Sequence, residues 1–334
     1  MARDFCTLFD ANYLARAIAL YRSLERVCDE FTLHAFCMDD RSFEILRRLE
    51  APRLRAVPLA ALEQRDPELH AVKGDRTQVE YCWTATPAIC LSLLEPDAGV
   101  SEVTYLDADL MFFASPEPLF EELGDGCVLI VPHRYVPSLR RFEELSGIYN
   151  VQFLVFRRTP EGLGALRWWR ERCLEWCRAV PEPGRFGDQK YLDDWPDRFE
   201  GVRVLQHPGG GLAPWNSARY ELRPDGAGGV RVDGRELVFY HYHALRLLGE
   251  GRIRTLGRLL RAFHVTDGVV WRSVHPLSRP ERELVWEPYL RRLAEAMAEI
   301  RRVEPAFREG LVEPRKGDLR IEVGRRARTV FGAR

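Results

Sequence analysis

Two aspartates, Asp107 and Asp109, stand directly after the apolar, strand-like segment 103–106 and before a second apolar run at 110–113. Aspartate has poor strand propensity, and a carboxylate is seldom buried unless it is paired or bound to a metal. If the strand continued, the two side chains would lie on one face and repel each other. A hard divalent cation such as Mg²⁺ or Mn²⁺ would relieve the repulsion, since it binds oxygen ligands and often shares them with substrate phosphates. The alternative is a solvated turn at the strand end, and the aspartates alone do not decide between the two.

Two histidines, His241 and His243, lie in a strand-like segment, 237–243, in which they share one face with Phe239. A cation held by two carboxylates takes further ligands, and imidazole nitrogens suit Mn²⁺ better than Mg²⁺. Two histidines on a strand are also common as packed or surface residues. Zinc is a further alternative, although zinc sites of this make-up belong mainly to hydrolases, and the sequence holds no His-Glu-x-x-His.

A third polar pair, Asp188 and Gln189, follows Gly187. A helix N-cap would account for the aspartate. It would not explain the preceding glycine or the glycine-rich, aromatic loop at 208–216.

The first strand–helix turn carries a carboxylate and an aromatic ring, Asp10 and Tyr13, where a nucleotide base and ribose could hydrogen-bond and stack. No Gly-x-Gly-x-x-Gly follows the first strand, and the sequence contains no Walker A motif. The missing phosphate-binding motifs argue against a dinucleotide dehydrogenase or an ATPase.

Strand-like and helix-like segments alternate along the first part of the chain, which predicts an α/β fold with parallel strands and right-handed crossovers. The strands are expected at 4–9, 31–37, 54–59 and 103–106, and the helices at 14–24, 43–49 and 78–94. The fourth strand, 103–106, should lie near the centre of the sheet. Ligands bind at the carboxyl ends of such strands, where Asp107 and Asp109 are found. Residues 61–76 are expected to be irregular.

The second part of the chain continues with similar elements and ends in a basic tail. Strands are expected at 127–131, 151–156, 202–206 and 237–243, a hairpin at 220–222 and 230–232, and helices at 116–123, 161–178 and 280–300. The segment 313–334 has seven basic and three acidic residues, a net charge of +4. We expect a solvated tail, with weak contact to an anionic membrane surface as the alternative.

The amino-acid composition excludes several classes of protein. The chain has 334 residues, 46% of them apolar, and a formal net charge of −1, so it lacks the global basic field of nucleic-acid binders. Its eight cysteines form no Cys-x-x-Cys pair, and Cys173 and Cys177 are expected to pack in the core. With no signal-peptide core near the N-terminus and no apolar run of about 18 residues, we expect a cytoplasmic protein with reduced thiols.

Taken in order, five segments resemble the bacterial nucleotide-diphospho-sugar glycosyltransferases of the GT-A fold, and family 8 of that class in particular. They cover about residues 4–246 and are Cys6–Ala17, Tyr105–Asp109, Tyr149–Phe153, Gly187–Leu192 and Phe239–Ala244. The resemblance implies a mixed, mainly parallel central sheet flanked by helices. It also implies a nucleotide-sugar-binding catalytic domain at 1–246 and a helical C-terminal extension at 247–334.

The resemblance also implies roles for single residues. Asp107 and Asp109 would bind Mn²⁺ or Mg²⁺ on the donor diphosphate, with His241 as third ligand and His243 as the alternative. The nucleoside would be held by Thr7, Phe9, Asp10 and Tyr13, and the donor sugar and the bond being broken would be surrounded by Asn150, Asp188 and Gln189. Two positions depart from the family pattern, since Gln152 replaces a small residue and Arg246 stands near a lysine position, where it would take over a phosphate contact.

The activity implied is transfer of a sugar, with retention, from a nucleotide-diphosphate sugar, UDP-linked, to a saccharide or lipid-linked saccharide acceptor. The sequence leaves open a non-catalytic nucleotide-sugar or carbohydrate-binding protein, and a metal-dependent nucleotidyltransferase or phosphoesterase. Trp168 and Trp169 are expected to pack inside rather than to stack on a sugar. The loop around Trp215, which has an exposed-looking aromatic, is the better acceptor candidate.

Overall fold

A computed structural model of the chain describes residues 2–248, 264–266, 269–273 and 277–312. The basic tail at 313–334, for which the sequence predicts a solvated or membrane-contacting segment, lies outside these residues. Within them, the helices are α1 (Leu14–Val27), α2 (Asp40–Arg47), α3 (Leu59–Glu63), α4 (Pro67–Val72), α5 (Gln78–Leu93), α6 (Glu117–Leu123), α7 (Phe142–Ser146), α8 (Pro160–Glu175), α9 (Trp195–Arg198), α11 (Arg279–Glu281) and α12 (Glu287–Val303).

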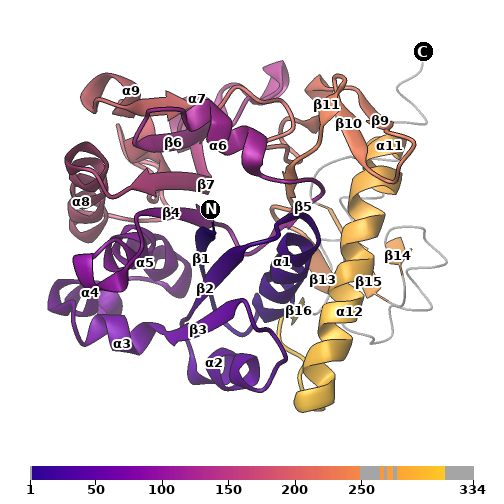
Figure 1. The fold of residues 1–334 in the computed structure, drawn as a ribbon, viewed down its shortest axis with the longest axis horizontal. Coiled ribbons are helices and arrows are strands. Elements are labelled where there is room, and N and C mark those ends of the chain that lie inside the picture. Colours follow the sequence, from indigo (N-terminus) through magenta and orange to yellow (C-terminus); the bar gives the residue numbers. More distant parts are fainter. Residues whose placement is uncertain (1, 249–263, 267–268, 274–276, 313–334) are drawn as a thin grey trace.

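A seven-stranded sheet forms the centre of the molecule (Figure 1). Its strands, in spatial order, are β3 (Leu54–Pro58), β2 (Phe31–Cys37), β1 (Arg3–Phe9), β4 (Glu102–Leu106), β7 (Tyr149–Arg157), β6 (Val128–Pro132) and β8 (Val202–Val204). The pairs β1–β2, β1–β4, β2–β3 and β6–β8 are parallel, whereas β7 runs antiparallel to both of its neighbours. The predicted mixed, mainly parallel sheet is therefore confirmed, and β4 occupies its central position.

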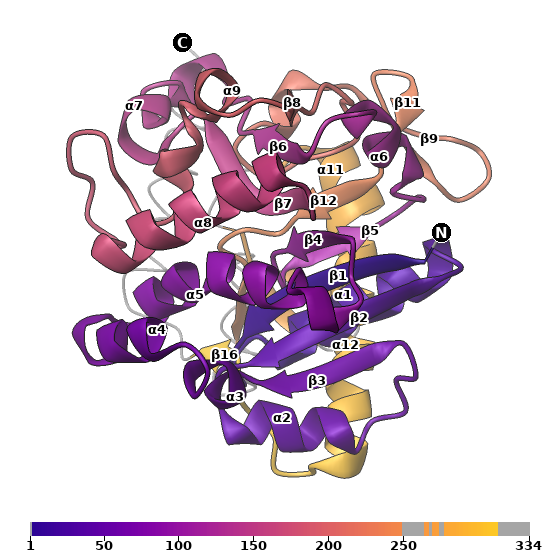
Figure 2. The same ribbon diagram turned by 60° about the vertical axis from the view of Figure 1, so that its left-hand side comes forward.

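Helices cover both faces of this sheet because successive strand residues point to opposite sides. On β1, Cys6 and Leu8 pack with α5 and α8, whereas Phe5 packs with α1. Figure 2 shows α5 and α8 on the near side of the sheet and α1 with α12 behind it. Trp169 of α8 is fully buried, as expected, and Trp168 packs partly buried against the same core.

The segment at 61–76, expected to be irregular, is helical: α3 and α4 are followed by a short 3₁₀ turn, Lys73–Asp75. The prediction was wrong because these helices are specified by capping rather than by a long apolar repeat. The side chain of Asp66 accepts a hydrogen bond from the backbone N–H of Leu69 at 3.0 Å, and Pro67 occupies the first helical position.

Smaller sheets complete the fold. A two-stranded sheet pairs β5 (Leu110–Phe112) with β12 (Phe239–His241), and the predicted hairpin forms a three-stranded sheet of β9 (Leu222–Pro224), β10 (Val230–Val232) and β11 (Arg235–Glu236). A four-stranded sheet contains β13 (Arg246–Leu248), β14 (His264–Thr266), β15 (Val269–Arg272) and β16 (Leu311–Val312). The C-terminal extension thus contains strands as well as the predicted helix.

The C-terminal helix α12 packs along α1. Leu290, Leu293 and Ile300 of α12 are fully buried in the core cluster that contains Leu14 and Ile18 of α1. This apolar face makes α12 part of the same core as the N-terminal helix. The domain boundary predicted at residue 246 stays a prediction.

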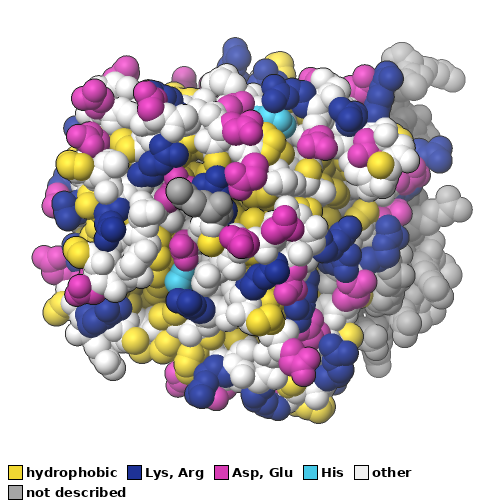
Figure 3. All heavy atoms as spheres, viewed as in Figure 1, with side chains coloured by type: hydrophobic (Ala, Val, Ile, Leu, Met, Phe, Trp, Pro, Cys, Tyr) yellow, Lys and Arg dark blue, Asp and Glu magenta, His cyan; other side chains and the backbone are white. Residues whose placement is uncertain are grey.

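Charges of both signs are interspersed on the molecular face seen in Figure 3, without a large area of one sign. Among the described residues, no helix is both long enough and apolar enough to cross a membrane.

We predict that Leu293→Ala lowers the free energy of unfolding by about 2 to 5 kcal/mol, because it leaves a cavity between α12 and α1. The matched control Arg291→Ala changes an exposed side chain on the same helix and should stay within about 0.5 kcal/mol of wild type. Urea denaturation of both variants measures the difference. Equal stability would show that α12 is not part of the cooperative core.

Candidate functional site

A cavity of about 770 Å³ opens at the edge of the sheet where β1, β4 and β6 have their carboxyl ends. Because β7 is antiparallel, its first residues, including Asn150, lie at this same edge. The residues that line the cavity come from six parts of the chain. These are 8–13 with 38, 78–83, 105–109, 133–150, 186–189, and 215 with 241 and 243. Segments far apart in sequence therefore meet at one site.

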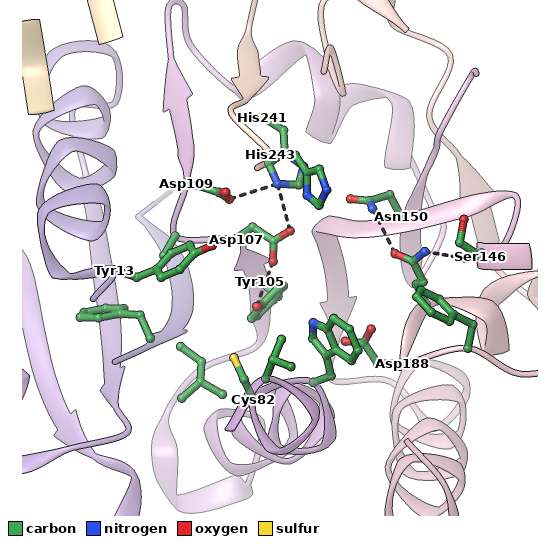
Figure 4. Close-up of a pocket in the computed structure, with 18 of the residues that line it drawn as sticks. Tyr13, Cys82, Tyr105, Asp107, Asp109, Ser146, Asn150, Asp188, His241 and His243 are labelled. Atoms are coloured by element: carbon green, nitrogen blue, oxygen red, sulfur yellow. Dashed lines mark hydrogen bonds and ion pairs between the residues drawn. The ribbon is translucent and has the colours of Figure 1, made fainter. Parts of the chain in front are cut away.

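Asp107 and Asp109 lie in a turn between β4 and β5 rather than on a continuing strand. The backbone N–H of Asp107 donates to the carbonyl oxygen of Gln152 at 3.0 Å, and that of Leu110 donates back to the carbonyl oxygen of Asp107 at 3.2 Å. The strand does not continue through these residues, so the two side chains do not share a strand face. The turn nevertheless keeps both carboxylates together (Figure 4).

The antiparallel pairing of β5 with β12 brings His241 to these carboxylates. His241 pairs with Leu110 across the two strands. Its Nε2 lies 3.0 Å from Asp109 Oδ1 and 3.6 Å from Asp107 Oδ2. One ligand atom from each of the three side chains lies within 4.8 Å of the others, a spacing that could hold a metal ion. Oxygen with one imidazole nitrogen is a donor set that suits Mn²⁺.

The charges of this triad are strongly coupled. Burial at the base of the cavity raises the pKa of Asp107 to about 6. Burial also opposes ionisation of Asp109, but His241 outweighs it and lowers the pKa of Asp109 to about 2. Burial works against the imidazolium form of His241, yet the two carboxylates raise its pKa overall. A bound divalent cation would displace the protons that the triad holds without it.

His243 lies outside this triad. The strand ends at His241, two residues earlier than expected, and the backbone turns at Ala244, whose φ is 58°. The ring of His243 is exposed and stands edge-on to His241 with ring centroids 5.6 Å apart. The expected strand face shared by Phe239, His241 and His243 is therefore wrong at its last residue, although His243 still lines the cavity.

One end of the cavity is formed by the first strand–helix turn. Phe9, Asp10 and Tyr13 line it. The carboxylate of Asp10 accepts hydrogen bonds from Gln78 Nε2 at 2.6 Å, from Asn12 Nδ2 at 2.9 Å and from the Tyr13 backbone N–H at 3.2 Å. Tyr13 is 41% exposed, so its ring is open to a ligand.

Three predicted binding residues do not line the cavity: Thr7, Gln152 and Arg246. Thr7 is fully buried within β1. Gln152 is also fully buried, and its side-chain amide has no hydrogen-bond partner among the described residues. Arg246 lies in β13, which pairs with the extension strand β15. Thr7 and Gln152 share a strand face with the lining residues Phe9 and Asn150, but each lies two positions further from the edge of the sheet at which the cavity opens.

The other end of the cavity carries uncharged polar groups and a buried carboxyl. Asn150 Nδ2 donates to Gln189 Oε1 at 3.2 Å, and both residues line the cavity. Asp188 precedes a 3₁₀ helix, Gln189–Leu192, but its side chain makes no cap hydrogen bond. Its carboxyl faces the cavity instead, and burial together with the charge of Asp107 raises the pKa of Asp188 well above its usual range. The N-cap alternative for Asp188 is therefore wrong.

Several lining residues were missed by the sequence analysis. His133, Tyr135 and Phe142 follow β6, and their signal was their position just after a strand parallel to β4. Trp215, expected to be exposed, is only 6% exposed and packs edge-on against His133 and His241. An aromatic wall therefore adjoins the polar end of the cavity.

No family model matches the chain. Two proteins of Bacillus subtilis (strain 168) are similar over nearly its whole length. The uncharacterized protein YfnF is 31% identical over 313 residues, which cover 92% of this chain and 97% of YfnF. The uncharacterized protein YfnD is 28% identical over 311 residues, which cover 92% of this chain and 94% of YfnD.

Two solved structures also resemble the chain at low sequence identity. The galactosyltransferase LgtC, in complex with donor and acceptor sugar analogs, is 17% identical, with 72% of this chain and 87% of LgtC covered and a TM-score of 0.48. Mouse xyloside xylosyltransferase 1 is 14% identical, with 73% and 98% covered and a TM-score of 0.45.

We predict that Asp109→Asn weakens Mn²⁺ binding by more than about a hundredfold. Loss of a residue that only hydrogen-bonds to a metal ligand typically lowers metal affinity about 10- to 100-fold, and Asp109 would be a direct ligand. His241→Ala should have a similar effect, and His243→Ala a much smaller one. Calorimetric titration with Mn²⁺ measures all three, with the exposed Asp97→Asn as matched control. Equal, mild effects of the two histidine variants would show that neither is a ligand.

We also predict that Mn²⁺ affinity falls as the pH is lowered. Below about pH 6 the carboxyl of Asp107 takes up a proton, and a protonated carboxyl or imidazolium cannot ligate. Each proton that the metal must displace costs about tenfold in affinity per pH unit. The same titration, repeated between about pH 5 and 7, measures the slope. A flat profile would argue against Asp107 as a ligand.

Proposed function

We propose a function for this chain, which belongs to the family of the Bacillus subtilis protein YfnF: it is a metal-dependent glycosyltransferase. The donor is a nucleotide-diphosphate sugar, UDP-linked, and the acceptor is a saccharide or a lipid-linked saccharide. The observation that carries the proposal is the arrangement of the cavity. Three possible metal ligands, Asp107, Asp109 and His241, lie between an end suited to a nucleoside and an end that carries amides and a buried carboxyl.

The triad fits a divalent cation. His241 lies between two carboxylates at the bottom of the cavity, and the three ligand atoms leave the cavity side open for further oxygen ligands. Asp107, Asp109 and His241 would hold Mn²⁺ or Mg²⁺ there. When bound, the ion would stabilise the negative charge that develops on the leaving diphosphate.

The residues of the first turn would bind the nucleoside. Asp10, held by Gln78 and by the backbone of Tyr13, would present a fixed carboxylate to the N–H and O–H donors of a base and ribose. The exposed ring of Tyr13 would stack on a planar base. These two interactions would orient the donor so that its diphosphate reaches the triad.

The polar end would hold the sugar. Burial raises the pKa of Asp188, which favours the protonated carboxyl, and in that form Asp188 would donate a hydrogen bond to a sugar hydroxyl. The amides of Asn150 and Gln189 would fix the ring near the bond to the diphosphate. Tyr135, Phe142 and Trp215 would offer aromatic surface to the acceptor, and aromatic rings pack well on the apolar faces of sugars. Retention of the anomeric configuration is part of this proposal.

The test is a thermal-shift and product panel. We expect a shift with UDP and with one UDP-sugar in Mn²⁺, and none in EDTA. A ligand at about 100 times its Kd adds about 2.7 kcal/mol of stability. The probes are UDP-glucose, UDP-galactose, UDP-N-acetylglucosamine and GDP-mannose. We further expect slow, Mn²⁺-dependent release of UDP from that donor without acceptor, abolished in Asp107→Asn and retained in the control Asp97→Asn.

The products distinguish this function from the alternatives left open by the sequence. A binding protein would show the thermal shift without releasing UDP. A nucleotidyltransferase or phosphoesterase would release pyrophosphate or free phosphate instead. Either result would contradict the proposal.

A further inference from the structure

His133 is held rigidly at the polar end of the cavity. It follows β6, is 2% exposed and stacks on Tyr135 with ring centroids 4.6 Å apart. Its backbone N–H donates to the carbonyl oxygen of Ile148 at 2.9 Å, and its own carbonyl oxygen accepts from Trp215 Nε1 at 2.9 Å. The ring therefore has little freedom to move.

The amide of Asn150 has one possible orientation. Its Oδ1 accepts from the backbone N–H of Gln152 at 3.0 Å, and a backbone N–H can only donate. Its Nδ2 is then the atom that faces His133 Nε2 at 3.1 Å and Gln189 Oε1 at 3.2 Å. Both Nδ2 hydrogens are used, and His133 Nε2 must offer a lone pair. His133 thus carries its proton on Nδ1.

The amide of Gln189 is oriented by the same chain of hydrogen bonds. Its Nε2 donates to the backbone carbonyl oxygen of Ser146, which can only accept, and its Oε1 accepts from Asn150. The backbone N–H of Gln152 at one end and the backbone carbonyl oxygen of Ser146 at the other therefore fix which atom donates in every hydrogen bond between them. One N–H and one lone pair of Gln189 remain for a ligand.

We propose that His133 is a positioning residue for the reaction: as a neutral ring with its proton on Nδ1, it holds Asn150, which in turn holds the side-chain amide of Gln189 toward the donor sugar. The inference rests on the proposed function, since it assigns His133 a part in that reaction. Burial also lowers the pKa of His133 to about 3, which keeps the ring neutral near pH 7.

The substitution that removes the acceptor is His133→Leu. It leaves one N–H of Asn150 without a partner, so Asn150 and Gln189 lose their fixed orientation. We expect kcat for UDP release from the best donor of the panel to fall about 10- to 100-fold. The KM for the donor and the affinity for Mn²⁺ should stay within about threefold, because neither the nucleoside end nor the triad contacts the changed atom.

The conservative variant His133→Gln places a carbonyl oxygen near the position of Nε2. We expect it to restore kcat to within about threefold of wild type. His70→Leu, at an exposed histidine that does not line the cavity, is the matched control and should leave kcat unchanged. An unchanged kcat in His133→Leu, or equal losses in the Leu and Gln variants, would overturn the proposal. A rise in the KM for the donor and a loss of Mn²⁺ affinity as large as the loss in kcat would also overturn the proposal.

A second measurement does not depend on turnover. Nitrogen-15 NMR of the His133 ring in the full chain should show a protonated Nδ1 and an unprotonated Nε2. Asn150→Asp puts an oxygen acceptor opposite Nε2 without changing the size of the side chain, so it should move a proton onto Nε2. The opposite tautomer in the wild type, or no change in Asn150→Asp, would overturn the proposal even if His133→Leu fails to fold.

The two measurements separate the two proposals. If the wild-type protein releases UDP from none of the donors, the proposed function fails, and the positioning role of His133 fails with it whatever the tautomer. If the wild type is active but the His133 variants or the NMR spectra give the results named above as contradicting the proposal, only the positioning role fails.

Discussion

The whole site depends on a buried imidazole set between two carboxylates. Asp107 and Asp109 could not both stay ionised at the base of a cavity without a positive partner, because like charges repel strongly where water is excluded. The pairing of β5 with β12 supplies that partner, since it fixes His241 3.0 Å from Asp109. A segment more than 130 residues away in sequence is thereby tied to the centre of the sheet. The small two-stranded sheet thus decides where charge can be held.

The mixed direction of the main sheet decides what surrounds that charge. A wholly parallel sheet would present only carboxyl ends of strands at the cavity edge. Because β7 runs the other way, Asn150 comes from the start of a strand and faces residues that follow β6. The two carboxylates of the triad therefore follow the carboxyl end of β4, whereas the amide end begins at the first residues of the neighbouring strand β7. This separation lets one cavity carry a strongly charged region and a neutral, hydrogen-bonded region together.

Much of this arrangement could be predicted from the sequence, because it is written in local patterns. The strand at 31–37 and the start of helix α5 at Gln78 follow from periodicity and capping residues, and Asp107 and Asp109 were identified because carboxylates after an apolar strand need an explanation. What could not be predicted depends on distant partners. His133 gains its significance only from Asn150, whereas Thr7 and Gln152 lie two positions too far inside their strands to line the cavity. Asp188 has the sequence context of a cap, and only its tertiary surroundings make it a cavity residue.

Different segments of the chain build the two ends of the cavity. The first turn and α5 line one end, whereas the segment from His133 to Ser146 and Trp215 line the other. Gene duplication followed by divergence can therefore change one end while the other is conserved. Substitutions between β6 and β7 would alter which molecule is accommodated there and leave the end built by the first turn intact. A lineage with this architecture can therefore change what one end of the cavity binds while the other end stays the same.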